Sequence, residues 1–255
     1  METVCHVITK LELGGAQEVA LYAVSHLDRS KFRTLLVTGP GGLLTDEAKT
    51  LPGVDVHVLS SLVRRVHILA DIAAFLELMR LFRRLRPAIV HTHSSKAGIL
   101  GRWAAWCASV PVIIHTIHGY GITPAQPSWL RRGLILLERM TGWITTHWIA
   151  VAQADIKKGI EWGLFDRMQV SVVRPGIDPL PFQTMLDTST RHALRASFGV
   201  GPDDFLVGTV ACLKPQKAPE DFVAVAKQVC DVAPEARFVL VGDGDLRPRI
   251  ESLIE

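Results

Sequence analysis

The sequence predicts an α/β protein that begins with a complete domain around a parallel sheet and continues into the first part of a second such domain. Three observations predict this fold class. Short β-branched runs alternate with longer stretches of helical period along the 255 residues. Nearly every run is apolar on both faces, which is typical of a sheet covered by helices on both sides. A segment rich in proline and glycine then interrupts the alternation, which restarts beyond it.

The first domain, residues 1–178, is expected to be Rossmann-like because strand and helix repeat in order. Its helical period is clearest over Ile68–Leu85, where an apolar stripe follows i, i+3, i+4, i+7 spacing. The other expected helices are Ala16–Leu27 and Lys96–Ala108. The expected strands are Val4–Thr9, Thr34–Thr38, Val54–Leu59, Ala88–Thr92, Val112–Thr116, Trp148–Val151 and Val170–Val173.

A boundary follows at Arg174–Pro181, which holds three prolines and a glycine in eight positions, and we expect a linker over 179–187. The second domain, 188–255, is expected to contain two strands and three helices: Ser189–Phe198, Phe205–Ala211, Pro219–Val232, Arg237–Val241 and Leu246–Glu255. Domains of this type usually take roughly 100–150 residues. We therefore expect 188–255 to be an incomplete domain and the sequence to be part of a larger two-domain protein.

Composition excludes several classes of protein. With 48% hydrophobic and 21% charged residues the chain is neither disordered nor fibrous, and a net charge of +3 is too small to favour general nucleic-acid binding. The four cysteines form no CxxC pair, which favours a reducing cytoplasm over a disulfide framework or a zinc site. No signal peptide is expected. Charged residues interrupt 133–152, the most apolar long stretch, so we expect no membrane span.

Unusual residues occur where expected strands lead into helices, which is where open parallel sheets bind ligands. Gly14 and Gly15 follow the first strand, and such glycines either let a phosphate approach the backbone or serve a tight turn. Four of the ten histidines end two strands: His91, His93, His115 and His118. A histidine at such an edge can bind a sugar hydroxyl or a leaving oxygen. For His91 and His115 a purely structural hydrogen bond is the favoured interpretation, whereas His118, before Gly119 and Tyr120, is favoured for function.

The second domain offers cations and glycines in equivalent places. Lys214 and Lys217 follow its first strand and can neutralise a diphosphate, with solvated surface lysines as the alternative. Gly242 and Gly244 join its second strand to a helix. Basic pairs on expected helices, together with tryptophans late in the first domain, can favour an anionic membrane surface, although scattered solvated charge is the simpler interpretation. The pairs begin at Arg64, Arg83, Arg131 and Lys157.

Six motifs together resemble family 4 glycosyltransferases, and the likeness extends over nearly the whole chain. They are GGAQ (14–17), HTHSSKAGILGR (91–102), VPVIIHTIHGYG (110–121), VVRPGID (172–178), GTVACLKPQKAP (208–219) and LVGDGDLRPRIE (240–251). The resemblance is strongest to enzymes that build capsular, exopolysaccharide or lipopolysaccharide chains in bacteria. It implies a GT-B fold, in which two Rossmann-like domains face each other, the first mainly binding the acceptor and the second a nucleotide-sugar.

The resemblance also implies roles for individual residues in a retaining transfer that needs no metal and no cofactor. His118 would contact the transferred sugar, and Lys217 would bind the donor diphosphate. The glycine loop at Gly14 and Gly15 would lie near the phosphates of a UDP- or GDP-linked donor, and Gly242 and Gly244 would line the nucleotide side. The candidates on the acceptor side are His93, Lys96, Gly119 and Tyr120. The expected partners are a nucleotide-sugar and a glycan or lipid-linked acceptor, not nucleic acid, with a cytoplasmic location that can include the membrane face.

Two departures from the family pattern affect the donor site. Cys212 stands where the family usually has an arginine, so either Lys214 takes over its role or phosphate binding is weaker. The family's two-glutamate segment, which grips the donor, is not within 1–255. Two other functions remain open: a truncated, non-catalytic module that binds an acceptor or a partner, and a metal-dependent hydrolase that uses the histidines at the strand ends. The hydrolase would need a carboxylate ligand, and neither histidine cluster contains one.

Overall fold

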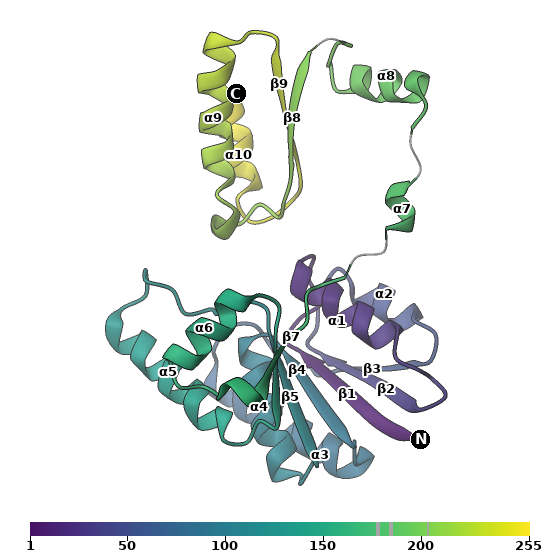
Figure 1. Cartoon of the computed structure of the whole chain (residues 1–255), viewed down its shortest axis with the longest axis vertical. Helices are drawn as coiled ribbons and strands as arrows, with labels where there is room; N and C mark the ends of the chain where they lie inside the picture. Colours follow the sequence, from purple (N-terminus) through teal and green to yellow (C-terminus); the bar gives the residue numbers. More distant parts are fainter. Residues whose placement is uncertain (177–178, 184–185, 203) are drawn as a thin grey trace. The chain divides into compact units, whose positions relative to one another are not determined.

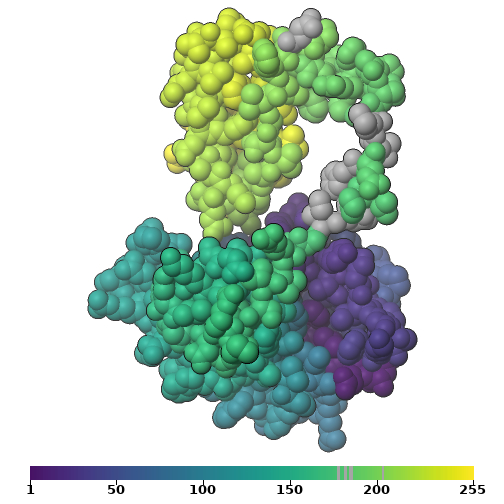
Figure 2. Space-filling view, in the orientation of Figure 1, coloured from purple at the N-terminus to yellow at the C-terminus, as the bar shows by residue number. Residues whose placement is uncertain are grey.

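A computed structural model describes residues 1–176, 179–183, 186–202 and 204–255, and the chain divides into two compact units, Met1–Gly176 and Ile177–Glu255. The expected first domain, 1–178, ends at residues outside this description, and the expected linker, 179–187, includes two more. Figure 2 shows the first unit as a continuous surface coloured from purple to green. Each unit is described by itself below.

Seven strands form the sheet of the first unit. They are β1 (Glu2–Ile8), β2 (Phe32–Thr38), β3 (Val54–Val58), β4 (Ile89–His93), β5 (Val112–Ile117), β6 (His147–Ala150) and β7 (Val170–Val172). All neighbours are parallel, in the order β3-β2-β1-β4-β5-β6-β7 (Figure 1). The seven strands expected from sequence are therefore confirmed, with ends that differ by one or two residues. The α/β fold class is confirmed with them.

Helices cover this sheet on both faces. They are α1 (Gly15–Ser25), α2 (Thr45–Thr50), α3 (Ile68–Leu85), α4 (Ser95–Cys107), α5 (Ser128–Gly142) and α6 (Gln153–Glu161), with a short 3₁₀ helix, η1 (Arg167–Gln169). Cys5 and Val7 on β1 pack with α3 and α4, whereas Ile8 on the opposite face packs with α1 and α2. The apolar runs of β1 are thus buried on both sides, as a central parallel strand requires.

The clearest expected helix is confirmed residue for residue. α3 spans Ile68–Leu85, and His67 caps it by accepting a hydrogen bond from the Ala70 amide. Helix α2 was not expected, whereas α5 and α6 contain the basic pairs at Arg131 and Lys157 that were expected to lie on helices, and α5 overlaps the stretch considered as a membrane span. Leu136, Leu137 and Met140 on α5 remain exposed. No helix in the described residues is both long and apolar enough to span a bilayer.

The second unit contains two parallel strands and their helices. The strands are β8 (Phe205–Val210) and β9 (Ala236–Val241). The helices are α7 (Leu180–Gln183), α8 (Thr188–Ser197), α9 (Pro219–Val232) and α10 (Arg247–Ile254), with the 3₁₀ turn η2 (Pro215–Lys217). Asp187 caps α8 by accepting from the Thr190 amide. On β8, Phe205 and Val210 are 70% and 84% exposed, so this small sheet leaves apolar side chains uncovered in the described residues.

Candidate functional site

The order of strands places the candidate site where β1 and β4 lie side by side. Successive strands are added toward one edge of the sheet from β1 to β3 and toward the other edge from β4 to β7, so the strand order reverses at this parallel pair. In open α/β sheets ligands bind outside the carboxyl ends of the strands at such a point. Thr9 and Ser94, which follow the two strands, are joined by a 2.8 Å hydrogen bond between their hydroxyl oxygens. The Thr9 hydroxyl also accepts from the Ala97 amide at the start of α4. Ser94 has a positive φ of 63°, a conformation that these contacts help to hold.

A row of histidines lies beneath this edge. In the parallel register His6 on β1 stands opposite His91 on β4, and alternation along β4 puts His93 on the same face as His91. His6 Nδ1 lies 3.1 Å from His93 Nε2, and His93 Nδ1 lies 3.1 Å from His118 Nε2. His118 is the first residue after β5. Two of the predicted site residues, His93 and His118, are thus in direct contact.

Burial keeps these imidazoles neutral. His6 and His93 are 2% and 1% exposed, and His118 is partly buried. Desolvation lowers the pKa of His6 to about 4 and that of His118 to about 4, and it lowers the pKa of His93 well below the ordinary histidine value. Each ring at neutral pH therefore has one N–H donor and one lone-pair acceptor.

The remaining two strand-end histidines have structural partners. His91 Nε2 lies 2.7 Å from the Thr116 hydroxyl oxygen. His115 points to the opposite face of the sheet, where its Nδ1 lies 2.8 Å from the Thr92 hydroxyl and its ring meets the edge of Trp148. One nitrogen of each ring is thus paired with a side-chain hydroxyl.

Three of these histidines are near enough to be considered as metal ligands. One nitrogen each from His6, His91 and His93 lies within 4.8 Å of the others. This group contains no carboxylate, and it differs from the set proposed from sequence because it includes His6 and leaves out His115 and His118. His6 was not recognised as a functional residue, since a single histidine in an apolar strand has no local signal, and only the pairing of β1 with β4 brings it to the others.

The other acceptor-side candidates in the first unit take distinct positions. Lys96 forms an ion pair with Asp71 on α3 and donates to the Arg65 carbonyl, so it fixes the loop that precedes α3. Tyr120 stacks edge-on against Trp162, and its hydroxyl donates to the Asp155 carbonyl at 3.1 Å.

Two glycine positions near the same edge of the sheet are open. Gly119 has a positive φ of 93°, and a Cβ built on it meets no atom within 4 Å. A Cβ on Gly15, at the start of α1, likewise meets nothing, whereas one on Gly14 would come within 2.9 Å of the Gln17 side chain. The structure therefore leaves space beside Gly15 and Gly119.

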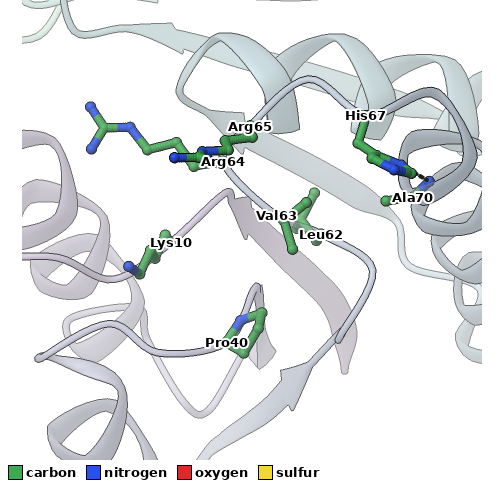
Figure 3. Close-up of a pocket in the computed structure, with 8 residues that line it drawn as sticks. All are labelled: Lys10, Pro40, Leu62, Val63, Arg64, Arg65, His67 and Ala70. Carbon is green, nitrogen blue, oxygen red and sulfur yellow. Dashed lines mark hydrogen bonds between the residues drawn. The ribbon is translucent and has the colours of Figure 1, made fainter.

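A basic cavity of about 500 Å³ opens among the loops that follow β1, β2 and β3 (Figure 3). Its lining combines cations with apolar side chains: Lys10, Pro40, Leu62, Val63, Arg64, Arg65, His67 and Ala70. Glu12 pairs with Lys10 at 3.2 Å and with Arg64 at 3.0 Å. The expectation that Arg64 and Arg65 lie on a helix is wrong, because they lie in the loop before α3.

Exposed apolar residues adjoin this basic loop in sequence. Val66, Ile68 and Leu69 are 86%, 74% and 74% exposed. Three large apolar side chains in contact with water within four residues are unusual for a surface that meets only solvent. The loop and first turn of α3 thus combine positive charge with exposed apolar side chains.

In the second unit the predicted glycines bring two loops together. A Cβ on Gly242 would lie 1.9 Å from the Ala211 carbonyl oxygen, and one on Gly244 would lie 2.6 Å from that of Leu213. Both have positive φ, and the Leu213 amide donates to the Asp243 carbonyl between them. Only glycine permits this approach of the β9–α10 loop to the segment after β8. Lys217 at the end of η2 is exposed, and Lys214 is partly buried.

A family model provides the decisive comparison. Residues 13–179 match the model described as Glycosyltransferase Family 4. The chain belongs to glycosyltransferase family 4. The chain is also 31% identical over 245 residues to the UDP-Gal:alpha-D-GlcNAc-diphosphoundecaprenol alpha-1,3-galactosyltransferase of Escherichia coli, covering 95% of this chain and 62% of that protein. It is 22% identical to the capsular polysaccharide biosynthesis glycosyltransferase CapM of Staphylococcus aureus, over 78% of this chain and 53% of the relative.

Solved structures agree on the fold. Anabaena HepE in complex with UDP and glucose superposes with a TM-score of 0.79 at 18% identity, covering 100% of this chain and 66% of that one. Sucrose-phosphate synthase from Thermosynechococcus elongatus gives a TM-score of 0.73 at 15% identity, over 100% of this chain and 67% of that one. The GT-B-like fold expected from the motifs is thereby confirmed. The chain spans 62% and 53% of the lengths of the two curated relatives and about two thirds of the lengths of the two solved structures.

Proposed function

We propose that the whole protein transfers a sugar from a nucleotide-sugar to a lipid-linked acceptor, with retention of configuration and without a metal, at the cytoplasmic face of a membrane in cell-surface polysaccharide synthesis. The basic cavity beside exposed Val66, Ile68 and Leu69 carries the acceptor part of this proposal. The E. coli relative supports the choice of a lipid-linked acceptor, because its name gives the acceptor as a sugar diphosphate attached to undecaprenol.

The acceptor's chemistry fits the cavity. A diphosphate requires cations, and the cavity is lined by Lys10, Arg64 and Arg65, of which Lys10 and Arg64 would exchange Glu12 for the phosphates. A polyprenyl chain requires apolar surroundings, and the exposed side chains of the same loop can enter the acyl boundary of the bilayer beside it. In this arrangement the sugar of the acceptor extends from the diphosphate toward the carboxyl ends of β1 and β4, where His118 lies.

The donor is assigned to the second unit by the family resemblance. Lys217 binds the donor diphosphate, Lys214 supplies the charge that Cys212 cannot, and the loop of Gly242 and Gly244 borders the nucleotide. As the nucleotide leaves, negative charge grows on the diphosphate, and a lysine held beside it stabilises that state. In this mechanism His118 and the open backbone at Gly15 contact the transferred sugar and its phosphates in the first unit.

A transfer reaction with the full-length protein tests the activity. Purified protein is incubated with UDP- or GDP-sugars and an N-acetylglucosamine diphosphate polyprenol, with and without EDTA, and the product linkage is determined by NMR. We expect one donor to be used, an α-linked product from an α-linked donor, and full activity in EDTA. A β-linked product would contradict retention, and activity that disappears in EDTA and returns with a divalent metal would contradict metal independence.

The lysines are tested by calorimetric titration of the same protein with the preferred nucleotide. Lys217→Ala is expected to weaken binding by about 10- to 100-fold, the value of a hydrogen bond to a charged group. Lys214→Ala is expected to weaken it as well, and Lys227→Ala, which removes an exposed lysine from α9, serves as the control. Unchanged affinity in Lys214→Ala would show that Lys214 does not replace the family arginine.

Membrane contact is tested with the 255-residue chain and vesicles of phosphatidylcholine with or without phosphatidylglycerol. We expect sedimentation with the anionic vesicles only, and loss of binding in Ile68→Asp/Leu69→Asp. Val232→Asp/Ile254→Asp introduces the same two charges at residues of the second unit that are 83% and 65% exposed, and should bind like the parent chain. Equal sedimentation of all three proteins would show that the loop before α3 does not contact the membrane.

A further inference from the structure

His6, His93 and His118 form a continuous hydrogen-bonded chain of imidazoles. The two N–N distances are both 3.1 Å, and the two centroid separations are both 5.4 Å. Each centroid separation exceeds its N–N distance by about two ring radii, so the bonded nitrogens lie nearly on the line between the ring centres. The planes of His6 and His93 differ by only 12°, which places each lone pair in line with the facing N–H.

Such a chain permits only two arrangements of protons. A neutral imidazole has one donor and one acceptor, and His93 uses both nitrogens within the chain. If His93 donates to His118 it must accept from His6, and if it accepts from His118 it must donate to His6. The tautomers of the three rings are therefore linked, and a change of the His6 tautomer requires a change of the His118 tautomer two rings away.

The outer end of the chain is available to a ligand. His118 Nε2 is engaged by His93, and across residues 1–176 and the described parts of 179–255 its Nδ1 has no hydrogen-bond partner. The adjacent Gly119 leaves open space beside it. Nδ1 is thus the atom through which His118 can meet a sugar hydroxyl.

We propose that His6 and His93 are positioning residues that fix the ring orientation and the tautomer of His118, so that Nδ1 meets the substrate in one predetermined hydrogen-bonding state. This inference rests on the proposed function for the role of His118 in transfer. The linkage between the tautomers of the three histidines, however, is present in the protein without substrate. A ring held in one tautomer loses no binding energy to the selection of that tautomer when the sugar binds.

The same geometry disfavours the metal site that His6, His91 and His93 suggest by proximity. A metal requires the lone pairs of its ligands to converge on one point. In the structure His6 Nδ1 and His93 Nε2 point at each other, and His91 Nε2 is turned to the Thr116 hydroxyl. Because His93 uses both of its nitrogens within the row of histidines, a cation could be bound by His93 only after one of its two hydrogen bonds had been broken.

The test measures the tautomer of His118 by NMR in the 255-residue chain labelled with ¹⁵N-histidine. The ¹⁵N shifts distinguish the protonated ring nitrogen from the unprotonated one, and His118→Gln assigns its signals. His6→Phe removes the distant link, and His6→Asn restores a polar atom close to the position of Nδ1. His91→Phe is the matched control, because His91 packs against both His6 and His93 and also loses one hydrogen bond, yet is not part of the chain.

We expect one dominant His118 tautomer in the parent chain. In folded His6→Phe the two ring shifts of His118 should move toward each other, in His6→Asn they should return toward the parent values, and in His91→Phe they should remain. In the full-length enzyme His6→Phe should lower kcat several-fold with little change in the donor KM. Unchanged His118 shifts in His6→Phe, or an equal change in His91→Phe, would overturn the linkage.

Titration with Zn²⁺ provides an independent decision. We expect no stoichiometric binding of Zn²⁺. If one equivalent of Zn²⁺ shifted the signals of His6, His91 and His93 together, these histidines would form a metal site and not a hydrogen-bonded row, and the proposal would be refuted. These measurements need no substrate. A full-length protein without transferase activity would therefore refute the proposed function and leave the linkage standing, whereas unlinked tautomers in an active enzyme would refute only this inference.

Discussion

The ion pair of Arg102 with Glu138 allows a quantitative test of how the first unit is held together. Arg102 on α4 is fully buried and donates from Nε to the Gly98 carbonyl, from Nη1 to the Thr145 hydroxyl at 3.2 Å, and from Nη2 to Glu138 on α5 at 2.7 Å. Its guanidinium carbon lies 4.7 Å from the centroid of a Trp148 ring. One side chain thus connects α4, α5, the turn before β6 and β6 itself.

Glu138→Leu leaves the guanidinium charge buried without its counter-charge. Breaking such a pair costs about 3–5 kcal/mol, because the remaining charge is no longer compensated in a medium of low dielectric constant. Arg102→Met leaves Glu138, whose side chain is 12% exposed, and should cost about 3 kcal/mol because that carboxylate can turn toward water. The double variant removes both charges and should recover most of the loss, since apolar replacements of a buried pair are often neutral.

Urea unfolding followed by tryptophan fluorescence is the appropriate assay, because all six tryptophans lie between residues 103 and 162 and report on the first unit alone. Arg33→Met is the control, since it breaks an ion pair with Asp55 of which both members are about half exposed, and it should cost about 0–1 kcal/mol. A loss below about 1 kcal/mol for Arg102→Met, or a double variant as unstable as the sum of both single variants, would refute this account of the pair.

Two further predictions concern the same unit. Gly98→Ala should lower the unfolding free energy by about 1–3 kcal/mol, because the new Cβ would lie 2.6 Å from a ring carbon of the buried His115, whereas Gly133→Ala, which meets nothing within 4 Å, should be neutral or stabilising in the same urea experiment. Acid should destabilise the unit, because burial lowers the pKa of His6 and of His118 to about 4 while their unfolded values remain near 6.5. Between these pH values the unfolded chain binds protons that the folded chain does not, so the unfolding free energy should fall as the pH drops from 6.5 toward 4, by up to about 1.4 kcal/mol per pH unit for each histidine. Urea midpoints measured from pH 7 to 5 test this. A midpoint that does not change with pH would mean that these rings take up protons in the folded unit at the same pH as in the unfolded chain.

The sequence predicts most of the fold because buried parallel strands are continuous apolar runs. Such runs mark β1 and β2 in the centre of the sheet, and a strong apolar stripe locates α3 at both ends. Helix α2 was missed because its six residues show less than two turns of any period. Local pattern thus suffices for elements that the core constrains on every side and fails for those at the surface.

The candidate site was predicted in part for the same physical reason. Alternation along β4 was enough to place His91 and His93 on one face, but the position of His6 depends on strand order, which is a non-local property. Strand order also brings Lys10 into one cavity with Arg64 and Arg65, which follow a different strand. The donor-side glycines show the converse, because their pattern was recognised from sequence whereas their close contact with the Ala211 and Leu213 carbonyls became clear only in three dimensions.

Neutral imidazoles suit the buried part of a site whose substrates carry diphosphates. A carboxylate in place of His93 would repel such a substrate, and an ammonium there would have to be desolvated at a cost that only a permanent counter-ion could offset. A neutral imidazole avoids both penalties and still offers a directed donor and acceptor. The cations that a diphosphate requires lie instead at Lys10, Arg64 and Arg65, along the wall of an open cavity where water can solvate them in the absence of substrate. Under the proposed function, this division places directional hydrogen bonding in the buried part of the site and charge along its open wall, where a bound diphosphate would take over Lys10 and Arg64 from Glu12, their partner in the free protein.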